Sequence, residues 1–511
     1  MDSNSQSNHQ DSRHRAPLFQ AMVDHQARNP VSLHVPGHKS GQGLLSEGAD
    51  YLQQVMSVDF TEITGLDDLH HAEGVILEAE QLAADCFGAE ETHFLIGGST
   101  VGNLAMISAV CERNDILLVQ RNVHKSVLHG LMLAGARAVF IAPAIDSETG
   151  IAASVRIEDV RQALEQYPEA KGLFLTNPNY YGIGTELTPF AELMHAHGKV
   201  LLVDEAHGAH YGFHPQVPAS ALSHGADAVV QSTHKMLTAM TMGAMLHLQG
   251  PLIDRGAIRR LLGMLQSSSP SYPIMASLDL ARKRMHTEGQ AWMAAGIAVV
   301  TEFRSLLDGI SRFHYFPKEF PAVQPTDVSE EGRETADPFK VALYDATNRL
   351  TPTELKERLE EQGVYIEMTD ARHVLLVFTP ATSRAEMLRV ADALNNICLD
   401  APEQKKELQA PISNILKLPY YTRISSPVAF DLRERSGAKQ GEEAVRKVSI
   451  QDAVGMKSAD MVIPYPPGVP YLYPGEIITE SIVQALEQLA ASGIKFQGTE
   501  FGQTHKLKIY T

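Results

Sequence analysis

Lys235, in the segment QSTHKMLTAMTMG, is the residue of this chain best suited to covalent chemistry. Met236 and Leu237 follow it, and an apolar setting of this kind disfavours the charged ammonium and makes the amine a better nucleophile. Ser232 and His234 stand beside the lysine and could bind a phosphate group. For a single lysine, a place on the surface remains the alternative.

Asp204 ends a run of apolar residues in KVLLVDEAHG, which predicts a carboxylate at the end of a buried strand. A carboxylate in such a place is costly unless it is paired, and a protonated pyridine nitrogen is a suitable partner. Ala206 is small enough to let a ring lie flat, and His207 could bond to a ring substituent. Asp204 and Lys235 are 31 positions apart, which leaves room for one crossover between neighbouring strands.

Two further segments place polar residues directly after predicted strands. HFLIGGSTVGN passes through a Gly-Gly pair to Ser99, Thr100 and Val101 at the beginning of a helix. Glycines let backbone N–H groups approach an anion, so this segment predicts a phosphate site, with a simple helix cap as the alternative. His124 follows the strand DILLVQ, where its imidazole could stack on a flat ring or simply cap a helix.

In chain order, these four segments supply a phosphate site, a stacking histidine, a strand-end carboxylate and a strand-end lysine. Ligands of open α/β sheets bind beyond the carboxyl ends of the strands, where such groups would meet. The combination predicts a site for pyridoxal 5′-phosphate (PLP), with Lys235 forming a Schiff base to it.

The pattern of apolar runs predicts the elements that would position this site. Short runs of Leu, Ile and Val alternate with amphipathic stretches from about residue 92, as in THFLI, DILLVQ, AVFIAP, GLFLTNP, KVLLVDEAHG and ADAVVQSTHK. Strands that alternate with helices indicate an α/β fold with a mostly parallel sheet. HKSVLHGLMLAG is expected to form a helix that ends at Gly135.

The remaining chain is expected to form a smaller C-terminal α/β domain and a further region. A long helical pattern covers about 280–310, a loop covers 324–338, and 400–425 is an irregular connector. TPTELKERLEEQG is a predicted helix, VYIEM and HVLLVF are predicted strands, and PYPPGVPYLYPGE is an ordered series of turns. The predicted divisions are a disordered tail at 1–15, a linker at 16–60, a PLP-binding domain at 61–305, a small domain at 306–400 and a C-terminal region at 401–511.

Charge and cysteine content narrow the partners and the compartment. The 511-residue chain has 43 basic and 61 acidic residues, a net charge of −18 that disfavours nucleic acid and anionic lipid. Its three cysteines form no CxxC pair or disulfide framework, which favours the cytoplasm. The sequence has neither the apolar region of a signal peptide nor a run long enough to span a bilayer.

Eight motifs make the sequence resemble the ornithine/lysine/arginine decarboxylase family, and in particular its short bacterial members. They are HVPGHKSG, GLDDLHHAEG, RNVHKS, TNPNYYG, VDEAHGAH, STHK, SSSPSYPIMASLD and PYPPGVP. The resemblance runs from about Pro17 to the C-terminus and implies PLP fold type I, the aspartate aminotransferase-like fold. It also implies a lyase of polyamine biosynthesis that decarboxylates a basic L-amino acid, arginine first and lysine or ornithine next, to the amine and CO₂.

The resemblance assigns roles to matched positions. Lys235, His124 and Asp204 would be catalytic. The cofactor would be bound by Ser99, Thr100, Val101, His124, Asp204, Ala206, His207, Ser232, His234, Lys235, Ser268 and Ser269. Ser268 or Ser269 would reach the phosphate of a neighbouring subunit, which implies a homodimer or a higher even oligomer, and the lack of an N-terminal wing domain argues against a decamer. Glu367 and Asp370 are candidates to receive the distal cation of the substrate, with surface acids as the alternative.

Three other functions remain open. An aminotransferase would share the fold but needs an arginine for the α-carboxylate of the substrate, and the sequence does not identify one. A metal-dependent hydrolase could use Asp204, Glu205, His207, His210 and His214, although their spacing differs from the helical HExxH pair. A non-catalytic scaffold would not require Lys235 beside a phosphate site.

Overall fold

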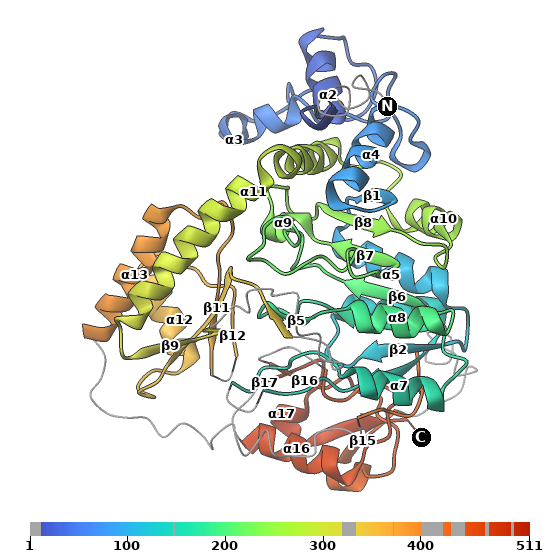
Figure 1. The fold of residues 1–511 in the computed structure, drawn as a ribbon, viewed down its shortest axis with the longest axis vertical. Helices are drawn as coiled ribbons and strands as arrows, with labels where there is room; N and C mark the ends of the chain where they lie inside the picture. Colours follow the sequence, from blue (N-terminus) through green and yellow to red (C-terminus); the bar gives the residue numbers. More distant parts are fainter. Residues whose placement is uncertain are drawn as a thin grey trace.

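The computed structural model describes residues 12–146, 149–318, 334–370, 372–399, 423–430, 445–465, 470–491 and 495–510. A large sheet occupies the centre of the molecule, a smaller sheet packs beside it, and the end of the chain forms a separate lobe (Figure 1). Within the described residues, no helix combines the length and apolar character needed to cross a membrane.

The large sheet has eight strands in the order β1-β8-β7-β6-β4-β2-β3-β14. Its central strands β7, β6, β4, β2 and β3 are parallel, whereas β8 and β14 pair antiparallel with their neighbours. The strands are β1 (Glu91–Leu95), β2 (Ile116–Gln120), β3 (Arg137–Ile141), β4 (Gly172–Thr176), β6 (Val200–Asp204), β7 (Ala228–Gln231), β8 (Ala244–Leu248) and β14 (Val428–Ala429). The predicted α/β fold with a mostly parallel sheet is confirmed.

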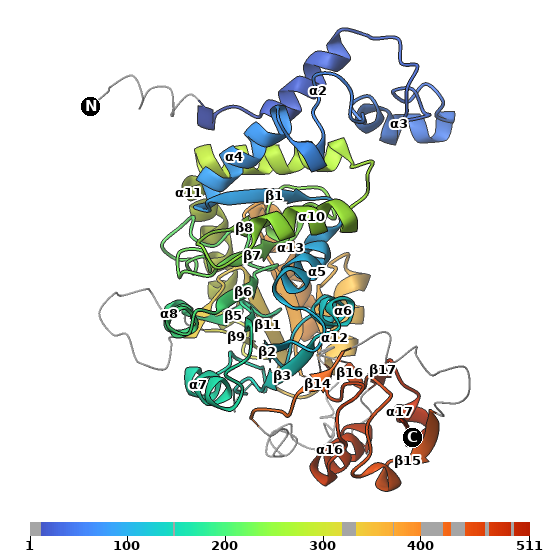
Figure 2. The ribbon, with the colours of Figure 1, turned by 90° about the vertical axis from the view of Figure 1, so that its right-hand side faces the viewer.

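Helices cover both faces of this sheet, which explains why its strands are apolar without alternation. One face packs against α5 (Gly98–Val110), α6 (Lys125–Ala134) and α10 (Arg255–Leu265), and the other against α4 (Val75–Phe87), α7 (Ile157–Gln166) and α8 (Thr188–Ala196). Figure 2 shows α5, α6 and α10 on one side of the strands and α7 and α8 on the other. As predicted, α6 ends at Gly135, whose φ of 68° is in the left-handed region.

The 37-residue helix α11 (Tyr272–Asp308) leads to the smaller sheet. That sheet has the order β12-β13-β11-β9, and α12 and α13 pack with it. The elements are β9 (Phe313–Phe316), β11 (Lys340–Asp345), α12 (Pro352–Glu361), β12 (Met368–Thr369), β13 (Val374–Val377) and α13 (Arg384–Leu399).

Two predictions in this region were wrong in part. The predicted loop at 324–338 contains β10 (Glu334–Ala336), which pairs with β5 (Ile183–Thr185) and so satisfies its backbone groups; 319–333 lie outside the described residues. Of the predicted strand VYIEM, only Met368 enters β12, because the backbone pairs with β13 only from that residue on.

The described residues from 445 onwards have a core of their own. Their elements are β15 (Arg446–Ser449), η2 (Gln451–Ala453), β16 (Ile463–Tyr465), α16 (Glu480–Ala491), β17 (Lys495–Gln497), α17 (Phe501–Thr504) and β18 (Lys506–Ile509). Pro464 begins the segment predicted as turns, yet it lies in the two-stranded pair β16–β17, where a strand has a free edge that tolerates proline. Parts of this segment (466–469) and of the predicted connector (400–422) lie outside the described residues.

The N-terminal end forms an arm on one side of the body. Helix α2 (Pro17–Ala27) packs through Leu18 and Met22, whereas α3 (Ser46–Met56) has no buried residue. Figure 2 shows α3 projecting away from the sheets. The 3₁₀-helix η1 (Leu69–His71) follows, and of the tail predicted to be disordered, residues 1–11 lie outside the described part while the next residues begin a helical turn.

Candidate active site

Lys235 lies in the one-turn helix α9 (Thr233–Met236), directly after β7. Its Nζ is 3.0 Å from Nε2 of His207 and 5.6 Å from the centre of the Tyr180 ring. Burial lowers the pKa of the amine, and the nearby Asp204 and Glu367 carboxylates only partly oppose this. The lysine therefore has the partly desolvated setting that a nucleophilic amine requires.

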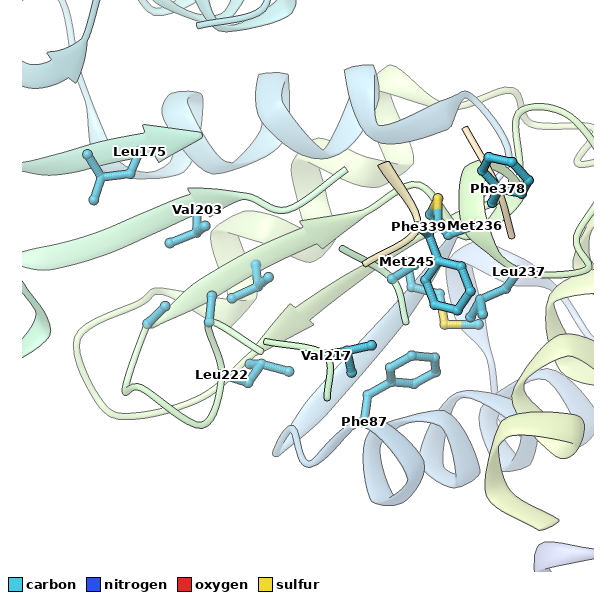
Figure 3. Close-up of a cluster of buried hydrophobic side chains, with 14 of the residues drawn as sticks. Phe87, Leu175, Val203, Val217, Leu222, Met236, Leu237, Met245, Phe339 and Phe378 are labelled. Atoms are coloured by element: carbon cyan, nitrogen blue, oxygen red, sulfur yellow. The ribbon is translucent and has the colours of Figure 1, made fainter. Parts of the chain in front are cut away.

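The residues after Lys235 fasten α9 to the core. Met236 and Leu237 are buried in the same cluster as Phe339 and Phe378, which belong to the segment that carries the smaller sheet. Figure 3 shows Met236 and Leu237 beside Phe339. The lysine is thus placed at the junction of the two sheets.

Asp204 is the last residue of β6, and β6 is the parallel neighbour of β7, as the one-crossover prediction required. Its carboxylate is 3% exposed. Oδ1 accepts a hydrogen bond from the N–H of Ala206 at 3.0 Å, and Oδ2 accepts one from Nδ2 of Asn103 at 2.8 Å. These two donors hold the carboxylate in place, and a carboxylate is a suitable partner for a protonated ring nitrogen.

His124 is the N-cap residue of α6, which was the alternative to a role in the site. The two roles are compatible, because capping uses only one nitrogen of the ring. Its Nδ1 is 2.8 Å from Oγ of Ser126 and accepts the N–H of the same residue at 3.3 Å. Burial lowers the pKa of the imidazole, Asp204 opposes this, and Lys235 adds to it. A neutral, fixed imidazole therefore lies within electrostatic reach of both strand-end groups.

The predicted phosphate site lies at the beginning of α5. Gly98 has a φ of +73°, which lets the chain turn from β1 into the helix, and no side chain caps the first turn. Ser232 donates a hydrogen bond from its Oγ to Oγ of Ser99 at 2.8 Å. Thr100 is exposed and Val101 is buried on the same turn. The structure thus combines uncapped N–H groups with two hydroxyls, which suits an anion.

His234, the other residue expected at the phosphate, is committed elsewhere through one of its nitrogens. Its Nδ1 is 3.0 Å from the carbonyl oxygen of Gly243, which leaves Nε2 as the atom able to face a ligand. The predicted contact between His234 and the phosphate would therefore be made by Nε2.

The residues present fit PLP. Nδ1 of His207 is buried and has no hydrogen-bond partner among the described residues, although Nε2 of the same ring contacts Lys235. An orphaned buried polar atom is costly, and a ring substituent of a bound cofactor would satisfy it. The uncapped α5 and the carboxylate of Asp204 provide the two other contacts that PLP requires.

The proposed cluster of metal ligands is separated in the structure. Glu205 points to Ser220 and Gln231, which donate to its Oε2 at 2.9 and 2.7 Å. His210 pairs with Asp337 at 3.1 Å. No group of three potential ligands gathers within the described part of the chain.

Ser268 and Ser269 are exposed in the loop between α10 and α11. Within the described part of the chain, neither hydroxyl makes a hydrogen bond, and only the backbone N–H of Ser269 is bonded, to Oγ of Ser267 at 3.2 Å. These two residues are therefore available to another molecule rather than engaged with the phosphate site of their own chain.

The two candidate substrate acids differ. Glu367 is exposed, and its charge acts on Lys235 and on the buried Lys340. Asp370 is held inside the chain, because Tyr181 donates its hydroxyl to Oδ2 and His373 contacts the same oxygen from Nδ1 at 2.9 Å. The structure thus leaves Glu367 as the carboxylate that is free to meet a cation.

Sequence reasoning missed three residues of the site: Asn103, Ser126 and Tyr180. Asn103 lies one helical turn beyond Ser99, and Ser126 lies two positions after His124, so both follow motifs that had already been noted. Tyr180 belongs to TNPNYYG, and its ring is 4.7 Å from that of His207. For Asn103 and Ser126 the signal available was proximity in sequence to a site residue, which indicates neither direction nor contact, and for Tyr180 it was the motif TNPNYYG alone.

Fold and site together define a PLP-dependent enzyme of fold type I. Residues 16–386 match the family described as Orn/Lys/Arg decarboxylase, major domain, and residues 432–504 match the C-terminal domain of that family. The chain belongs to this family. It is a PLP-dependent decarboxylase of basic amino acids.

Individual relatives agree. The chain is 38% identical over 501 residues to uncharacterized protein YaaO of Bacillus subtilis. The aligned region covers 97% of this chain and 98% of the relative. It is 32% identical over 500 residues to the arginine decarboxylase of the same organism, with 98% of each chain covered. The crystal structure of the lysine decarboxylase LdcF of Francisella novicida has a TM-score of 0.81 at 21% identity and covers 96% of this chain and 80% of that one, which supports the fold.

Proposed function

We propose that this enzyme converts L-arginine to agmatine and CO₂, with lysine and ornithine as poorer substrates, in the cytoplasm and as a step of polyamine biosynthesis. The observation that carries the chemistry is the pair formed by Lys235 and Asp204 at the ends of the neighbouring strands β7 and β6. Support for arginine comes from relatives named arginine decarboxylase that are 32% and 33% identical over 500 and 494 residues.

The residues proposed to hold the cofactor are those that the family resemblance assigns, and the contacts around Lys235 and Asp204 support them. Lys235 would hold PLP covalently, Asp204 would pair with the pyridine nitrogen, and His124 would stack on the ring with Ala206 on its other face. The phosphate would lie at the beginning of α5, at the Ser99 hydroxyl. When bound, PLP takes up the electron pair left at Cα as the bond to the carboxylate carbon breaks.

Lys235 and His207 are the groups proposed to move protons. Nζ of Lys235 is within hydrogen-bond distance of Nε2 of His207, so a proton can pass between these two atoms. Because burial lowers the pKa of Lys235, its amine can deliver a proton to Cα and recover it nearer to neutral pH than an exposed lysine could. The Tyr180 ring beside Nζ helps to exclude water.

The distal end of the substrate is proposed to meet Glu367. This carboxylate is exposed, lies within electrostatic reach of Lys235, and makes no side-chain hydrogen bond within the described ranges. A guanidinium offers two parallel N–H groups to a carboxylate, whereas an ammonium offers a point charge. Glu367 would therefore favour arginine most strongly if the contact is bidentate.

The active unit is proposed to be a homodimer in which Ser268 or Ser269 reaches the phosphate of the partner. Support comes from the exposed hydroxyls of this loop and from the part of the N-terminal arm around α3, a helix with no buried residue. Large exposed hydrophobic side chains gather there, namely Val31, Leu33, Val35, Leu45, Tyr51, Leu52 and Val55. Contiguous exposed apolar residues of this kind mark interaction surfaces.

The substrate proposal is tested by incubating the PLP-loaded enzyme with arginine, lysine and ornithine and measuring both CO₂ and the amine formed. The expected result is one amine and one CO₂ per substrate, with the highest kcat/KM for arginine. Higher kcat/KM for lysine or ornithine would overturn the choice of arginine. Formation of a keto acid without CO₂ would instead indicate an aminotransferase.

The variant Lys235→Ala tests the chemistry itself. We expect it to lose the visible absorbance of the covalently bound cofactor and to lose activity by roughly 10³-fold or more, because catalytic groups that act as a unit fail together. Lys283→Ala, on α11, removes the same charge outside the site. Activity near that of the wild type in Lys235→Ala would refute the assignment.

A further inference from the structure

A continuous chain of hydrogen bonds connects the two groups expected on the cofactor ring. Asn103, on α5, lies between them: its Nδ2 is 2.8 Å from Oδ2 of Asp204 and 2.9 Å from Oγ of Ser126. Oγ of Ser126 is in turn 2.8 Å from Nδ1 of His124. Asn103, Ser126 and Asp204 are at most 3% exposed, so water does not replace these bonds.

The donors and acceptors of this chain can be assigned. An amide nitrogen carries two hydrogens and accepts none, so Asn103 donates one hydrogen to Asp204 and the other to Ser126. The hydroxyl of Ser126 has one hydrogen, which is then directed to Nδ1 of His124. The backbone N–H of Ser126 also donates to this Nδ1, at 3.3 Å, so Nδ1 is an acceptor on two independent grounds.

The orientation of the Asn103 amide follows from the same chemistry. The opposite orientation would place its carbonyl oxygen against the Asp204 carboxylate, where two acceptors would repel each other. In the observed orientation, that oxygen is buried and has no hydrogen-bond partner among the described residues. The side-chain oxygen of Asn103 is thus a buried acceptor without a hydrogen bond, which costs free energy. The same orientation of the amide is the one that lets Asn103 donate to Asp204.

We propose that Asn103 is a positioning residue that orients Asp204 directly and, through Ser126, holds His124 with its ring proton on Nε2. This proposal deepens the proposed function, because it rests on the roles of Asp204 and His124 given above. One amide thereby sets the direction of the carboxylate and the tautomer of the imidazole. His124 presents an N–H donor from Nε2, and its Nδ1 cannot act as a base.

The charges around His124 agree with a neutral ring. Asp204 would favour the charged form, but burial outweighs it, and Lys235, Lys125 and His129 all act against a second positive charge. A protonated imidazole would also carry a hydrogen on Nδ1, directed against the N–H of Ser126. The neutral tautomer is thus selected by the hydrogen bonds and by the surrounding charges together.

The test measures the tautomer directly by ¹⁵N NMR of histidine-labelled apoenzyme, with the His124 signals identified by their loss in His124→Gln. We expect Nε2–H alone in the wild type. Ser126→Ala should give a mixture of tautomers, because only the longer bond from the backbone N–H of residue 126 to Nδ1 remains, and should weaken PLP binding less than Asn103→Ala does, because Asp204 keeps its Asn103 donor. Asn103→Ala should give the same mixture and should also weaken PLP binding about tenfold or more, because Asp204 loses a donor.

These variants separate the proposal from its alternatives. A wild-type His124 with its proton on Nδ1, or a pure Nε2–H tautomer in both variants, would overturn it. If Asn103→Ala fails to fold, the Ser126→Ala spectrum still decides the tautomer, and Asn103→Gln, which keeps the amide, supplies the second measurement of PLP affinity. The apoenzyme spectra remain informative even if the enzyme proves to act on a different amino acid.

Discussion

The two walls of the site, formed by the large sheet and by the smaller sheet, are held together in different ways. On the large sheet, Asn103 donates one hydrogen bond to Asp204 and one to Ser126, whose hydroxyl contacts Nδ1 of His124, so supporting side chains hold both residues of the site. On the smaller sheet, Asp370 resembles Asp204 in lying near a strand end, but its hydrogen bonds with Tyr181 and His373 occupy it fully.

The two walls would therefore have different roles: the large sheet supports the cofactor, and the smaller sheet recognises the substrate. The large-sheet wall is a rigid set of neutral imidazoles and oriented donors, as expected where a cofactor ring must be fixed. The smaller-sheet wall contains the buried Lys340, whose pKa burial lowers to about 8, and the exposed Glu367. Because Glu367 is a free carboxylate on this wall, a substitution there can change the substrate preference without disturbing the residues that hold the cofactor.

The largest effect is expected on the large-sheet wall. Asp204→Asn removes the charge that would keep the pyridine nitrogen protonated, so kcat should fall about 10²–10³-fold, as for loss of a key electrostatic contact. Steady-state kinetics and the absorbance spectrum of the cofactor measure this. Glu205→Gln, one residue further along but directed to Ser220 and Gln231, is the matched control and should leave the spectrum unchanged. Equal losses in both variants would contradict the role of Asp204.

The next effect is expected on the smaller-sheet wall. Glu367→Gln removes the free carboxylate, so KM for arginine should rise roughly ten- to a hundredfold, as for loss of a charge-assisted hydrogen bond, while kcat changes less. Glu361→Gln changes the net charge equally at the exposed end of α12 and should leave KM unaltered. A KM that stays constant in Glu367→Gln would show that another group binds the distal cation.

A smaller, structural effect is expected for Asp370→Asn. The variant weakens the contacts to Tyr181 and His373, which should lower stability by about 1–3 kcal/mol and leave KM close to that of the wild type. Thermal unfolding and kinetics on the same preparation measure both quantities. An increase in KM as large as that of Glu367→Gln would restore Asp370 as a substrate-binding residue.

The same contrast explains what could be predicted from the sequence. The strand ends carrying Asp204 and Lys235 follow from apolar runs, because a strand buried on both faces is apolar throughout, and adjacency in the parallel sheet then brings the two residues together. Asp370 is engaged inside the chain partly by Tyr181, a residue distant in sequence, and no local sequence pattern indicates that contact. Asn103 lies on a predicted helix, but its direction toward Asp204 depends on how α5 packs on the sheet.

The smallest effect concerns pH. Burial, with the charges of Lys235 and Lys340, lowers the pKa of His207 well below 6.5, so the folded protein keeps this ring neutral where the unfolded chain binds a proton. Stability from His207 is therefore complete above about pH 6.5 and declines as the pH falls below it, by at most about 1.4 kcal/mol per pH unit. Glu80 and Glu205, whose pKa values burial raises to about 7, act in the opposite direction.

Comparing His207→Gln with the wild type removes the contributions of those two glutamates, because both proteins contain them. Between pH 7 and pH 5, the unfolding temperature of the wild type should fall more, or rise less, than that of His207→Gln. Asp370→Asn should parallel the wild type over this range, because His373, Tyr181 and backbone donors outweigh burial and hold the pKa of Asp370 below 3.8. Its contribution is lost only as the pH falls below that value. A pH response in His207→Gln identical to that of the wild type would mean that the ring binds a proton in the folded enzyme as readily as in the unfolded chain, and the large-sheet wall would then not be built of imidazoles held neutral by the fold.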